Sequence, residues 1–469
     1  MKRIAIIGGG ISGLSAAFSL EQERRQGAQL EYVVFEASGR FGGVIRSERI
    51  DDCLLEAGPD SFLTEKPWAA DLCRELGLGD QLIGSSDAER KTYMLIKGRL
   101  LPIPDGLMFM IPTRLAPTFF SPLFSWPTKV RIIREWFSRP RQEEADATVA
   151  DFVQRHYGRE MVERVADPLL SGVYGGSADE LSVRSVLPRF VQMEASHGSL
   201  GKAMVAMRKG RGTRTLAPLF TSLKDGMQQI VDALLARIPV SAQRINTSVE
   251  AVKAESGKWP VVASQRTEEF DAVIVSAPAY AASGMLGNTE LGPELSAIRY
   301  SCSVVVILGY DQKVRAALPP GFGFLVPRAE NRGILAATFV HNKFPHRAPE
   351  DRALIRCFLG GTRDEAVQQV PDGEIQSLVR RELEQILGIH ADPLFVRIHK
   401  WNRSMAQYNV GHSARIARVR DLIARMPGLA LAGNAYSGIG VPDCVRSGSE
   451  AGEKVLADLA IASRAHSAN

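Results

Sequence analysis

The chain has 469 residues, of which 45% are hydrophobic and 23% are charged. This composition is typical of a folded globular protein and excludes wholesale disorder, and the length allows two or three domains. A formal net charge of +5 is too small to indicate a nucleic-acid-binding protein. The five cysteines are far apart, so neither disulfides nor a metal site is expected, and a reducing cytoplasm is favoured.

The N-terminal stretch MKRIAIIGGGISGLSAAFSL has two competing interpretations. Basic residues before a short apolar run resemble a secretory signal peptide. The same stretch has Gly8, Gly10 and Gly13 in G-x-G-x-x-G spacing, between a strand-like run and a helix-like segment. LEYVVFEA then predicts a second strand that ends in Glu36, which completes strand–helix–strand order. We therefore predict a retained dinucleotide-binding turn, with no signal peptide and no transmembrane helix.

Each residue type in this turn has a physical role. Gly8 allows a tight turn, Gly10 lets the backbone approach a pyrophosphate, and Gly13 permits close packing of the helix on the strand. The helix N-terminus offers free N–H groups to the phosphates. Glu36 is expected to accept both ribose hydroxyls.

A second glycine pair, Gly42 and Gly43, follows within EASGRFGGVIRS, with Arg40 before it. A bare NAD site needs no second backbone approach so soon after the acid. This segment resembles the extended FAD signature of the amine oxidase and phytoene desaturase superfamily. The resemblance implies that FAD is the cofactor and that Arg40 faces its pyrophosphate.

The C-terminal segment GLALAGNAYSGIGVPDCVRSGSEAGEKVLADLA predicts a strand, a glycine loop and a helix. Pro442 and Asp443 suit the first turn of that helix. Its N-terminus would stabilise the negative charge that gathers near N1 of a reduced flavin. DAVIVSAP, from Asp271 to Pro278, predicts a buried strand that returns the chain to the same domain.

Four further blocks resemble the porphyrinogen oxidases of haem biosynthesis, especially the bacterial oxygen-dependent type. They are LLEAGPDSFL, ADPLLSGVYGGSADELSVRS, KWNRSMAQYNVGH and LAGNAYSGIGVPDCVRSG. The resemblance implies a six-electron oxidation of protoporphyrinogen IX or coproporphyrinogen III by O2, with release of H2O2. Flavin N5 would accept the hydride, so no catalytic side chain is expected.

The resemblance also implies a set of FAD contacts. They are Gly8, Gly9, Gly10, Ile11, Ser12, Gly13, Glu36, Ala37, Arg40, Gly42, Gly43, Val44, Gly58, Pro59, Asp60, Ser61, Val249, Trp401, Val441, Pro442 and Asp443. Val44 stands where many superfamily members have a basic residue. Thr92 stands where mitochondrial and plastid relatives have an arginine for a substrate propionate, so the propionate anchor is not predicted.

Two residues are candidates for the tetrapyrrole pocket. Gly172 in LLSGVYGG would let a flat ring approach, with a simple turn glycine as the alternative. Phe358 in IRCFLGG would pack on the ring, with an ordinary core phenylalanine as the alternative. His341 and His346 have no partners at metal-ligand spacing, so surface histidines are favoured over a metal site. The basic run RKGRGTR, from Arg208 to Arg214, is expected to be a solvated loop rather than a guide for an acidic substrate.

The segment 107–137 is apolar, proline-broken and edged with basic residues. It fits a peripheral membrane contact and equally a helical cap over the pocket, and both alternatives stay open.

We predict an α/β fold with a discontinuous Rossmann-type FAD-binding domain, a strand-rich substrate domain and a helical subdomain. The expected ranges are 1–65, 225–283 and 420–469 for the first, 66–104, 212–224 and 284–419 for the second, and 105–211 for the third. Two other functions remain open: another flavin oxidase or desaturase of the superfamily, and a binding protein similar to GDP-dissociation inhibitors. The oligomeric state is not predicted.

Overall fold

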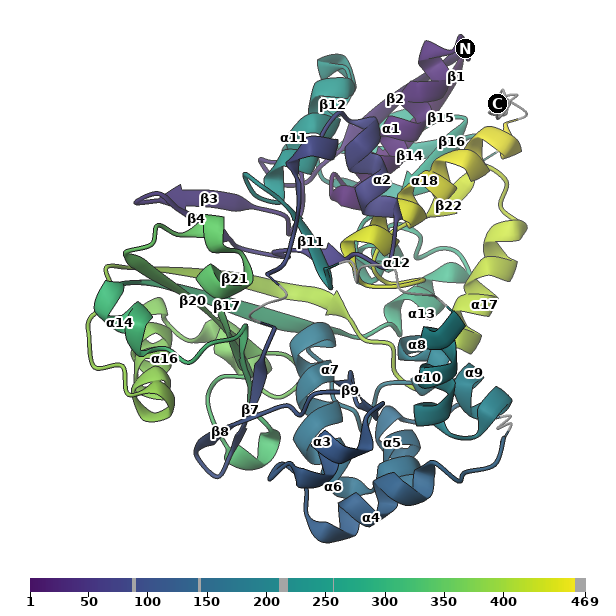
Figure 1. Ribbon diagram of the computed structural model, residues 1–469. Helices are drawn as coiled ribbons and strands as arrows, with labels where there is room; N and C mark the ends of the chain where they lie inside the picture. Colours follow the sequence, from purple (N-terminus) through teal and green to yellow (C-terminus); the bar gives the residue numbers. More distant parts are fainter. Residues whose placement is uncertain (87–89, 142–144, 211–217, 256, 460–469) are drawn as a thin grey trace.

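The computed structural model describes residues 1–86, 90–141, 145–210, 218–255 and 257–459. A parallel sheet with its helices, a larger mixed sheet and a group of helices follow one another from top to bottom in Figure 1. The mixed α/β class predicted from the sequence is confirmed. The basic run Arg208–Arg214 falls largely outside the described residues.

The parallel sheet has the strand order β12-β2-β1-β16-β22, and every neighbouring pair is parallel. Its strands are β1 (Lys2–Ile7), β2 (Leu30–Phe35), β12 (Gln243–Arg244), β16 (Ala272–Val275) and β22 (Leu429–Leu431). Their β-branched side chains, such as Ile4, Ile6 and Ile274, are fully buried. The carboxyl ends of strands from three distant parts of the chain therefore meet at one edge.

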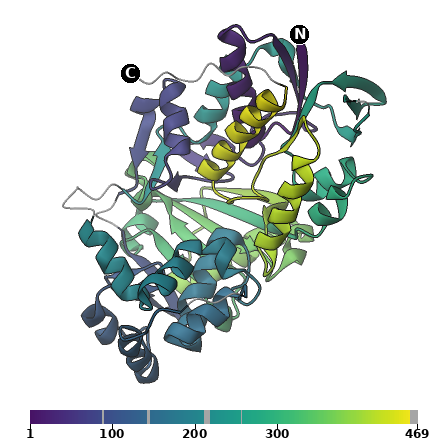
Figure 2. The same cartoon turned by 90° about the vertical axis from the view of Figure 1, so that its right-hand side faces the viewer.

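Helices from both ends of the chain pack together on this sheet. They are α1 (Ile11–Arg25) and α18 (Val441–Asp458), with α2 (Trp68–Glu75) and α11 (Gln228–Arg237) beside them. Figure 2 shows α18 in yellow alongside the dark α1. The helices approach closely because α18 presents Gly448 and Gly452 to α1.

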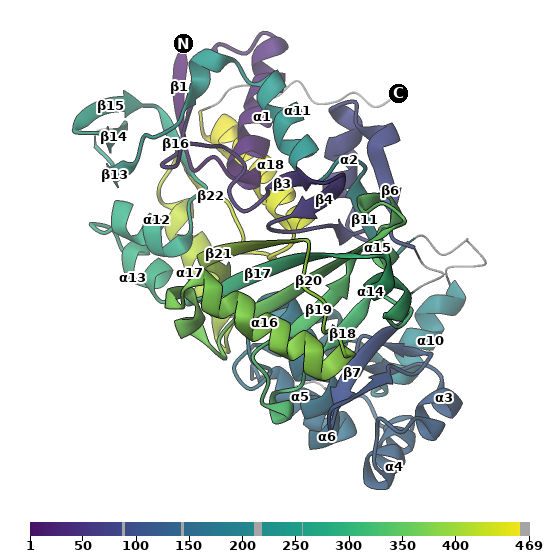
Figure 3. The same ribbon diagram turned by 90° about the vertical axis from the view of Figure 1, so that its left-hand side faces the viewer.

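The mixed sheet has seven strands in the order β21-β17-β20-β19-β18-β7-β8. They are β7 (Thr92–Ile96), β8 (Arg99–Pro102), β17 (Tyr300–Asp311), β18 (Gly323–Leu325), β19 (Ala336–Phe339), β20 (Arg352–Gly360) and β21 (Phe395–Ala406). Helix α16 (Asp372–Leu387) covers one face (Figure 3), where Ile375, Val379 and Leu383 join the core.

The opposite face of the mixed sheet meets the hairpin of β3 (Ser47–Ile50) and β4 (Cys53–Glu56). Leu55 of the hairpin packs with Val305, Ile307 and Leu354 of the sheet. Phe358 is only partly buried at the border of this cluster. The hairpin thus links the mixed sheet to the N-terminal unit.

The helical group is built from short helices after residue 114. They are α3 (Leu115–Phe120), α4 (Trp126–Glu135), α5 (Val149–Tyr157), α6 (Arg159–Met161), α7 (Asp167–Tyr174), α8 (Val183–Val186), α9 (Pro188–His197) and α10 (Leu200–Gly210), with a π-helical segment Val162–Ala166 before α7. Leu123, Phe152 and Tyr157 are buried at their centre. Among the described residues, no helix is both long and apolar enough to cross a membrane.

The remaining elements connect these parts. The strands are β5 (Phe62–Leu63), β6 (Leu82–Gly84), β9 (Leu107–Met108), β10 (Ile111–Pro112), β11 (Phe220–Leu223), β13 (Val249–Val252), β14 (Trp259–Ala263) and β15 (Arg266–Phe270). The helices are α12 (Ala279–Met285), α13 (Leu291–Ser296), α14 (Gln312–Ala317), α15 (Val340–Lys343) and α17 (His412–Ala424).

The expectation of a surface histidine is wrong for His341, which is 2% exposed. Its Nδ1 accepts a hydrogen bond from the Leu354 backbone N–H at 3.1 Å, which replaces water as a partner. Burial lowers the pKa of His341 to about 4. His346 is exposed, as expected.

Candidate active site

The first glycine turn joins β1 to α1, and its glycines differ in what surrounds them. A Cβ at Gly8, where φ is +105°, would lie 2.9 Å from the Ser276 backbone, and one at Gly13 would lie 1.9 Å from the Gly8 carbonyl oxygen. A Cβ at Gly10 would meet nothing within 4 Å. The protein's own packing therefore requires Gly8 and Gly13, whereas Gly10 faces open space.

Gly10 also stands at the N-cap of α1, where no side chain caps the helix. The first N–H groups of the helix thus remain available to an anionic ligand. The turn therefore offers backbone N–H groups without side chains in the way, and it lies at the carboxyl edge of a parallel sheet. This arrangement fits the pyrophosphate of a dinucleotide.

Glu36 lies beside this turn at the end of β2. Its Oε2 accepts a hydrogen bond from the Gly9 N–H at 2.8 Å, and its Oε1 accepts one from the Ser38 N–H at 2.8 Å. The Thr247 N–H donates to the Glu36 carbonyl oxygen at 2.8 Å. This bond brings the start of β13, with the buried Val249, to the same edge.

The second glycine pair packs directly on the first turn. The Gly42 N–H donates to the Gly9 carbonyl oxygen at 2.8 Å, and a Cβ at Gly43 would lie 3.3 Å from Gly10 Cα. Arg40 Nη1 donates to the Gly43 carbonyl oxygen at 2.6 Å, so here Arg40 holds its own loop. Val44 is 40% exposed.

The segment Ala57–Ser61 follows the β3–β4 hairpin and contacts the mixed sheet on the face opposite α16. Trp401 Nε1 on β21 donates to the Ala57 carbonyl oxygen at 2.7 Å. Arg356 on β20 donates to the Gly58 carbonyl oxygen, and Lys343 at the end of α15 lies 2.9 Å from Asp60. A Cβ at Gly58 would lie 1.8 Å from the Val44 carbonyl oxygen, so this segment also touches the residue that follows the second glycine pair.

The buried cations around Asp60 were not predicted from the sequence. Lys343, Arg347 and Arg356 surround Asp60, and Arg347 also lies 3.3 Å from Glu56. Burial acts to raise the pKa of Asp60, but these cations hold it below its ordinary range. Burial raises the pKa of Glu56 to about 7 against the opposing effect of Arg347. The one available signal was an arginine inside the otherwise apolar run ALIRCFLGG.

The start of α18 approaches the same region. Asp443 is 3% exposed and pairs with Lys66 at 2.6 Å. In the loop before α18, the Gly438 N–H donates to the hydroxyl of Tyr408 at 2.8 Å, and the Tyr408 ring lies 6.2 Å from that of Tyr174. The end of α7 and the start of α18 are therefore neighbours.

The two candidate pocket residues lie on facing elements. On the sheet, Phe358 pairs with Ala336, and Ala336 pairs with Leu325. A Cβ at Gly172 on α7 would lie 3.5 Å from the Leu325 side chain. Phe358 and Leu325 are two strands apart, about 10 Å. The row Phe358–Ala336–Leu325 is thus an apolar floor that α7 partly faces.

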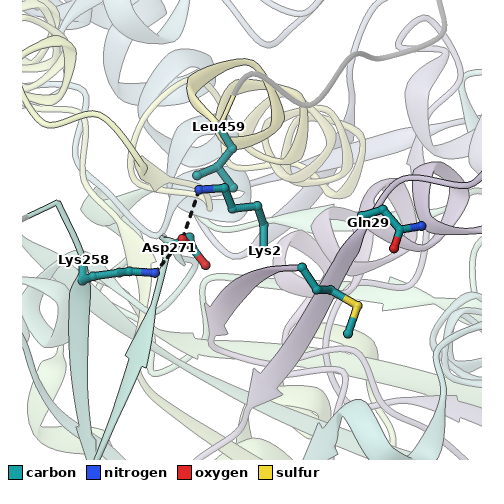
Figure 4. Close-up of a pocket in the computed structure, with 6 residues that line it drawn as sticks. Lys2, Gln29, Lys258, Asp271 and Leu459 are labelled. Carbon is teal, nitrogen blue, oxygen red and sulfur yellow. Dashed lines mark hydrogen bonds and ion pairs between the residues drawn. The ribbon is translucent and has the colours of Figure 1, made fainter.

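A separate pocket lies at the opposite, amino-terminal end of the parallel sheet (Figure 4). Its centre is Asp271, whose carboxylate pairs with Lys2 at 3.2 Å and Lys258 at 2.8 Å. Burial acts against ionisation, but these partners lower the pKa of Asp271 to about 2. No predicted site residue lines this pocket, so its ion pairs join β1 to its neighbours and are not part of the candidate site.

The family model for flavin containing amine oxidoreductases matches residues 11–456. The chain belongs to this family. FAD is its cofactor, and it is an oxidoreductase rather than a non-enzymatic binding protein.

Individual relatives match over their whole length. The coproporphyrinogen III oxidase of Bacillus subtilis (strain 168) is 34% identical over 98% of both chains, and that of Staphylococcus aureus is 32% identical over 98% of this chain and 100% of its own. A crystal structure from Exiguobacterium sp. 255-15, provisionally assigned as a protoporphyrinogen oxidase, superposes with a TM-score of 0.88 at 32% identity, covering 98% of this chain and 99% of its own. UDP-galactopyranose mutase shares the fold alone, with a TM-score of 0.71 at 16% identity.

Proposed function

We propose that this protein is an oxygen-dependent porphyrinogen oxidase of haem biosynthesis, with coproporphyrinogen III as its substrate. The observation that carries the proposal is full-length similarity above 30% identity to coproporphyrinogen III oxidases from several bacteria. The apolar row Phe358–Ala336–Leu325 supports it, because a porphyrinogen is a broad apolar ring that needs an apolar surface to lie on.

The parallel sheet would be a Rossmann-type unit that holds FAD. In this proposal, the turn Gly8–Gly13 and the N-terminus of α1 bind the pyrophosphate, and Glu36 exchanges its bond to Gly9 for the ribose hydroxyls. Gly42 and Gly43 bring a second stretch of backbone to the cofactor. The isoalloxazine end of FAD would be surrounded by Gly58–Ser61, Trp401 and Val441–Asp443, and the adenine end would lie at Val249.

The protein's own part in the reaction would be positioning. FAD, when bound, supplies the hydride acceptor. Phe358 and Ala336 would orient the ring from below, and Gly172, which approaches Leu325 at the end of the row, would border the ring at its edge. The buried start of α18 would place its positive dipole end beside the isoalloxazine. No side chain is required to act as a nucleophile.

The test is to purify the protein and give it coproporphyrinogen III and protoporphyrinogen IX separately. We expect flavin absorption, oxygen uptake and a fluorescent porphyrin, with coproporphyrinogen III oxidised faster. Faster oxidation of protoporphyrinogen IX would contradict the choice of substrate. Oxidation of an amine or a carotenoid, without any porphyrin, would assign the protein to another activity of the family.

We also propose that part of segment 107–137 contacts an anionic membrane surface. Phe120, Trp126 and Phe137 are 81%, 66% and 76% exposed, and the amine of Lys129 lies 5.2 Å from the Trp126 ring. Exposed aromatic side chains beside basic ones are typical of interfacial helices. The group lies in the proposed helical subdomain, 105–211.

Sedimentation with vesicles of anionic lipid tests this contact. Replacing Phe120, Trp126 and Phe137 together by Ser should abolish binding. The matched control is Val240→Ser, which removes an apolar side chain that is 84% exposed at another place. Equal binding by both variants would leave the helical cap as the role of this segment.

A further inference from the structure

We infer that Lys343, Arg347 and Arg356, here called the cation cluster, set the reduction potential of the bound flavin through the segment Gly58–Ser61. The inference rests on the proposed contact of that segment with the flavin. It assigns a role to three residues that the sequence analysis did not select.

Hydrogen bonds join each member of the cluster to this segment. Arg356 donates to the Gly58 carbonyl oxygen, and Arg347 Nη2 donates to the Asp60 carbonyl oxygen at 2.9 Å. Lys343 Nζ donates to Asp60 Oδ2 at 2.9 Å and to Ser61 Oγ at 3.0 Å. The cluster therefore supports the segment along its length.

The cluster is buried and carries an excess of positive charge. The side chains of Lys343, Arg347 and Arg356 are 11%, 0% and 6% exposed. Three cations face two carboxylates, Asp60 and Glu56, and the raised pKa of Glu56 means that it is only partly ionised near neutral pH. Water does not screen charges in such an environment well, so their field extends to neighbouring groups.

Stability alone gives no account of this arrangement. Arg347 Nε and Nη1 and Arg356 Nε are buried without a hydrogen-bond partner among the described residues. Buried cations with unused donors destabilise a fold relative to apolar side chains of similar size. An electrostatic role toward a group on the other side of Gly58–Ser61 explains the excess charge.

The expected effect follows from the charge of the two flavin states. Two-electron reduction leaves negative charge on the isoalloxazine ring, so nearby positive charge favours the reduced form. Arg356 also connects the cluster to the floor, since its guanidinium lies 4.8 Å from the centre of the Phe358 ring. Within the cluster, Arg356 thus lies between the cofactor segment and the proposed substrate surface.

Two substitutions of opposite sign test the inference in the FAD-loaded protein. Arg356→Gln removes a positive charge and should lower the midpoint potential, whereas Asp60→Asn removes a negative charge and should raise it. We expect the preference for reduced over oxidised flavin to change about tenfold in each case, which corresponds to about 30 mV for a two-electron couple. The potential is measured by spectroelectrochemistry without any porphyrinogen.

The control is Lys258→Met, which removes a cation at the far end of the parallel sheet and should leave the potential unchanged. Lys343→Met is a second variant that should lower the potential. Unchanged potentials, or shifts of the same sign in Asp60→Asn and Arg356→Gln, would overturn the inference. Loss of flavin from both cluster variants, Arg356→Gln and Lys343→Met, would also overturn it, since the cluster would then be purely structural. Failure of the wild-type protein to oxidise porphyrinogens leaves this measurement intact and counts against the proposed function only.

Discussion

A Cβ added at Gly448 in α18 would lie 2.1 Å from the carbonyl oxygen of Ser12 in α1. The C-terminal helix therefore touches the backbone of the N-terminal helix, directly behind the glycine turn. The same contact aligns the start of α18 with the proposed cofactor site. The geometry of the proposed cofactor site therefore depends on the contact between the two ends of the chain.

Replacing Gly448 by Ala should separate these helices, because a backbone oxygen cannot move aside as a side chain can. We expect a loss of about 1–3 kcal/mol in the free energy of unfolding, together with a lower flavin content. Thermal unfolding and flavin absorbance of the purified protein measure both. Gly284→Ala in α12 is the matched control, since nothing lies within 4 Å of its added Cβ. Equal stability of the two variants would contradict the contact.

Gly10→Val should remove FAD without unfolding the protein. Its φ of −74° suits any residue, and the space around it is open. We expect the melting temperature of the FAD-free protein to be unchanged and FAD affinity to fall at least roughly tenfold, or about 1.4 kcal/mol. Gly13→Val should instead unfold the protein, because its Cβ would meet the Gly8 carbonyl oxygen. Full flavin content in Gly10→Val would show that the pyrophosphate lies elsewhere.

His156 should make stability depend on pH. It is buried between Glu194 and Glu135, at 3.1 and 3.5 Å. Burial opposes its protonation, but hydrogen bonds to both carboxylates raise its pKa above the ordinary value of 6.5. Because the folded state holds the proton more tightly, this stabilisation is complete below pH 6.5 and is lost as the pH rises through the folded-state pKa.

The measurement is the melting temperature of the wild-type protein and of His156→Gln between pH 6 and 9. The difference between them should be largest at pH 6 and shrink toward pH 9. A difference that grows with pH would mean that the imidazole is buried in its neutral form.

Gly172→Ala should disturb the substrate and not the fold. Its added Cβ would make only an ordinary contact with Leu325 at 3.5 Å. In the proposed pocket, the methyl group would occupy space at the edge of the floor, where the ring would lie beside α7, and would raise KM for the porphyrinogen by roughly tenfold. Steady-state kinetics measure this, with Gly373→Ala in α16, on the far face of the sheet, as the control. An unchanged KM would leave Gly172 as an ordinary helix residue.

The turn, strands and helix of the N-terminal unit were predictable because they depend on residues that are neighbours in the sequence. The glycine spacing, the strand before it and Glu36 after it lie within one strand–helix–strand unit, and the structure has these elements where the sequence indicates them. The start of α18 was predictable for the same reason, since Pro442 and Asp443 suit a first helical turn wherever the helix packs. His341 was mispredicted because its burial depends on β20, with which it is paired only after folding.

The sequence by itself determined the local features of the site. They are turns that only glycine allows, a helix start without a capping side chain, and an acidic side chain at the end of a buried strand. Only the tertiary structure placed Lys343 beside Asp60, 283 residues away in the chain, and showed that Arg347 is fully buried. The physical reason is that backbone conformation depends on neighbouring residues, whereas the charge that acts on a buried group depends on which distant strands surround it.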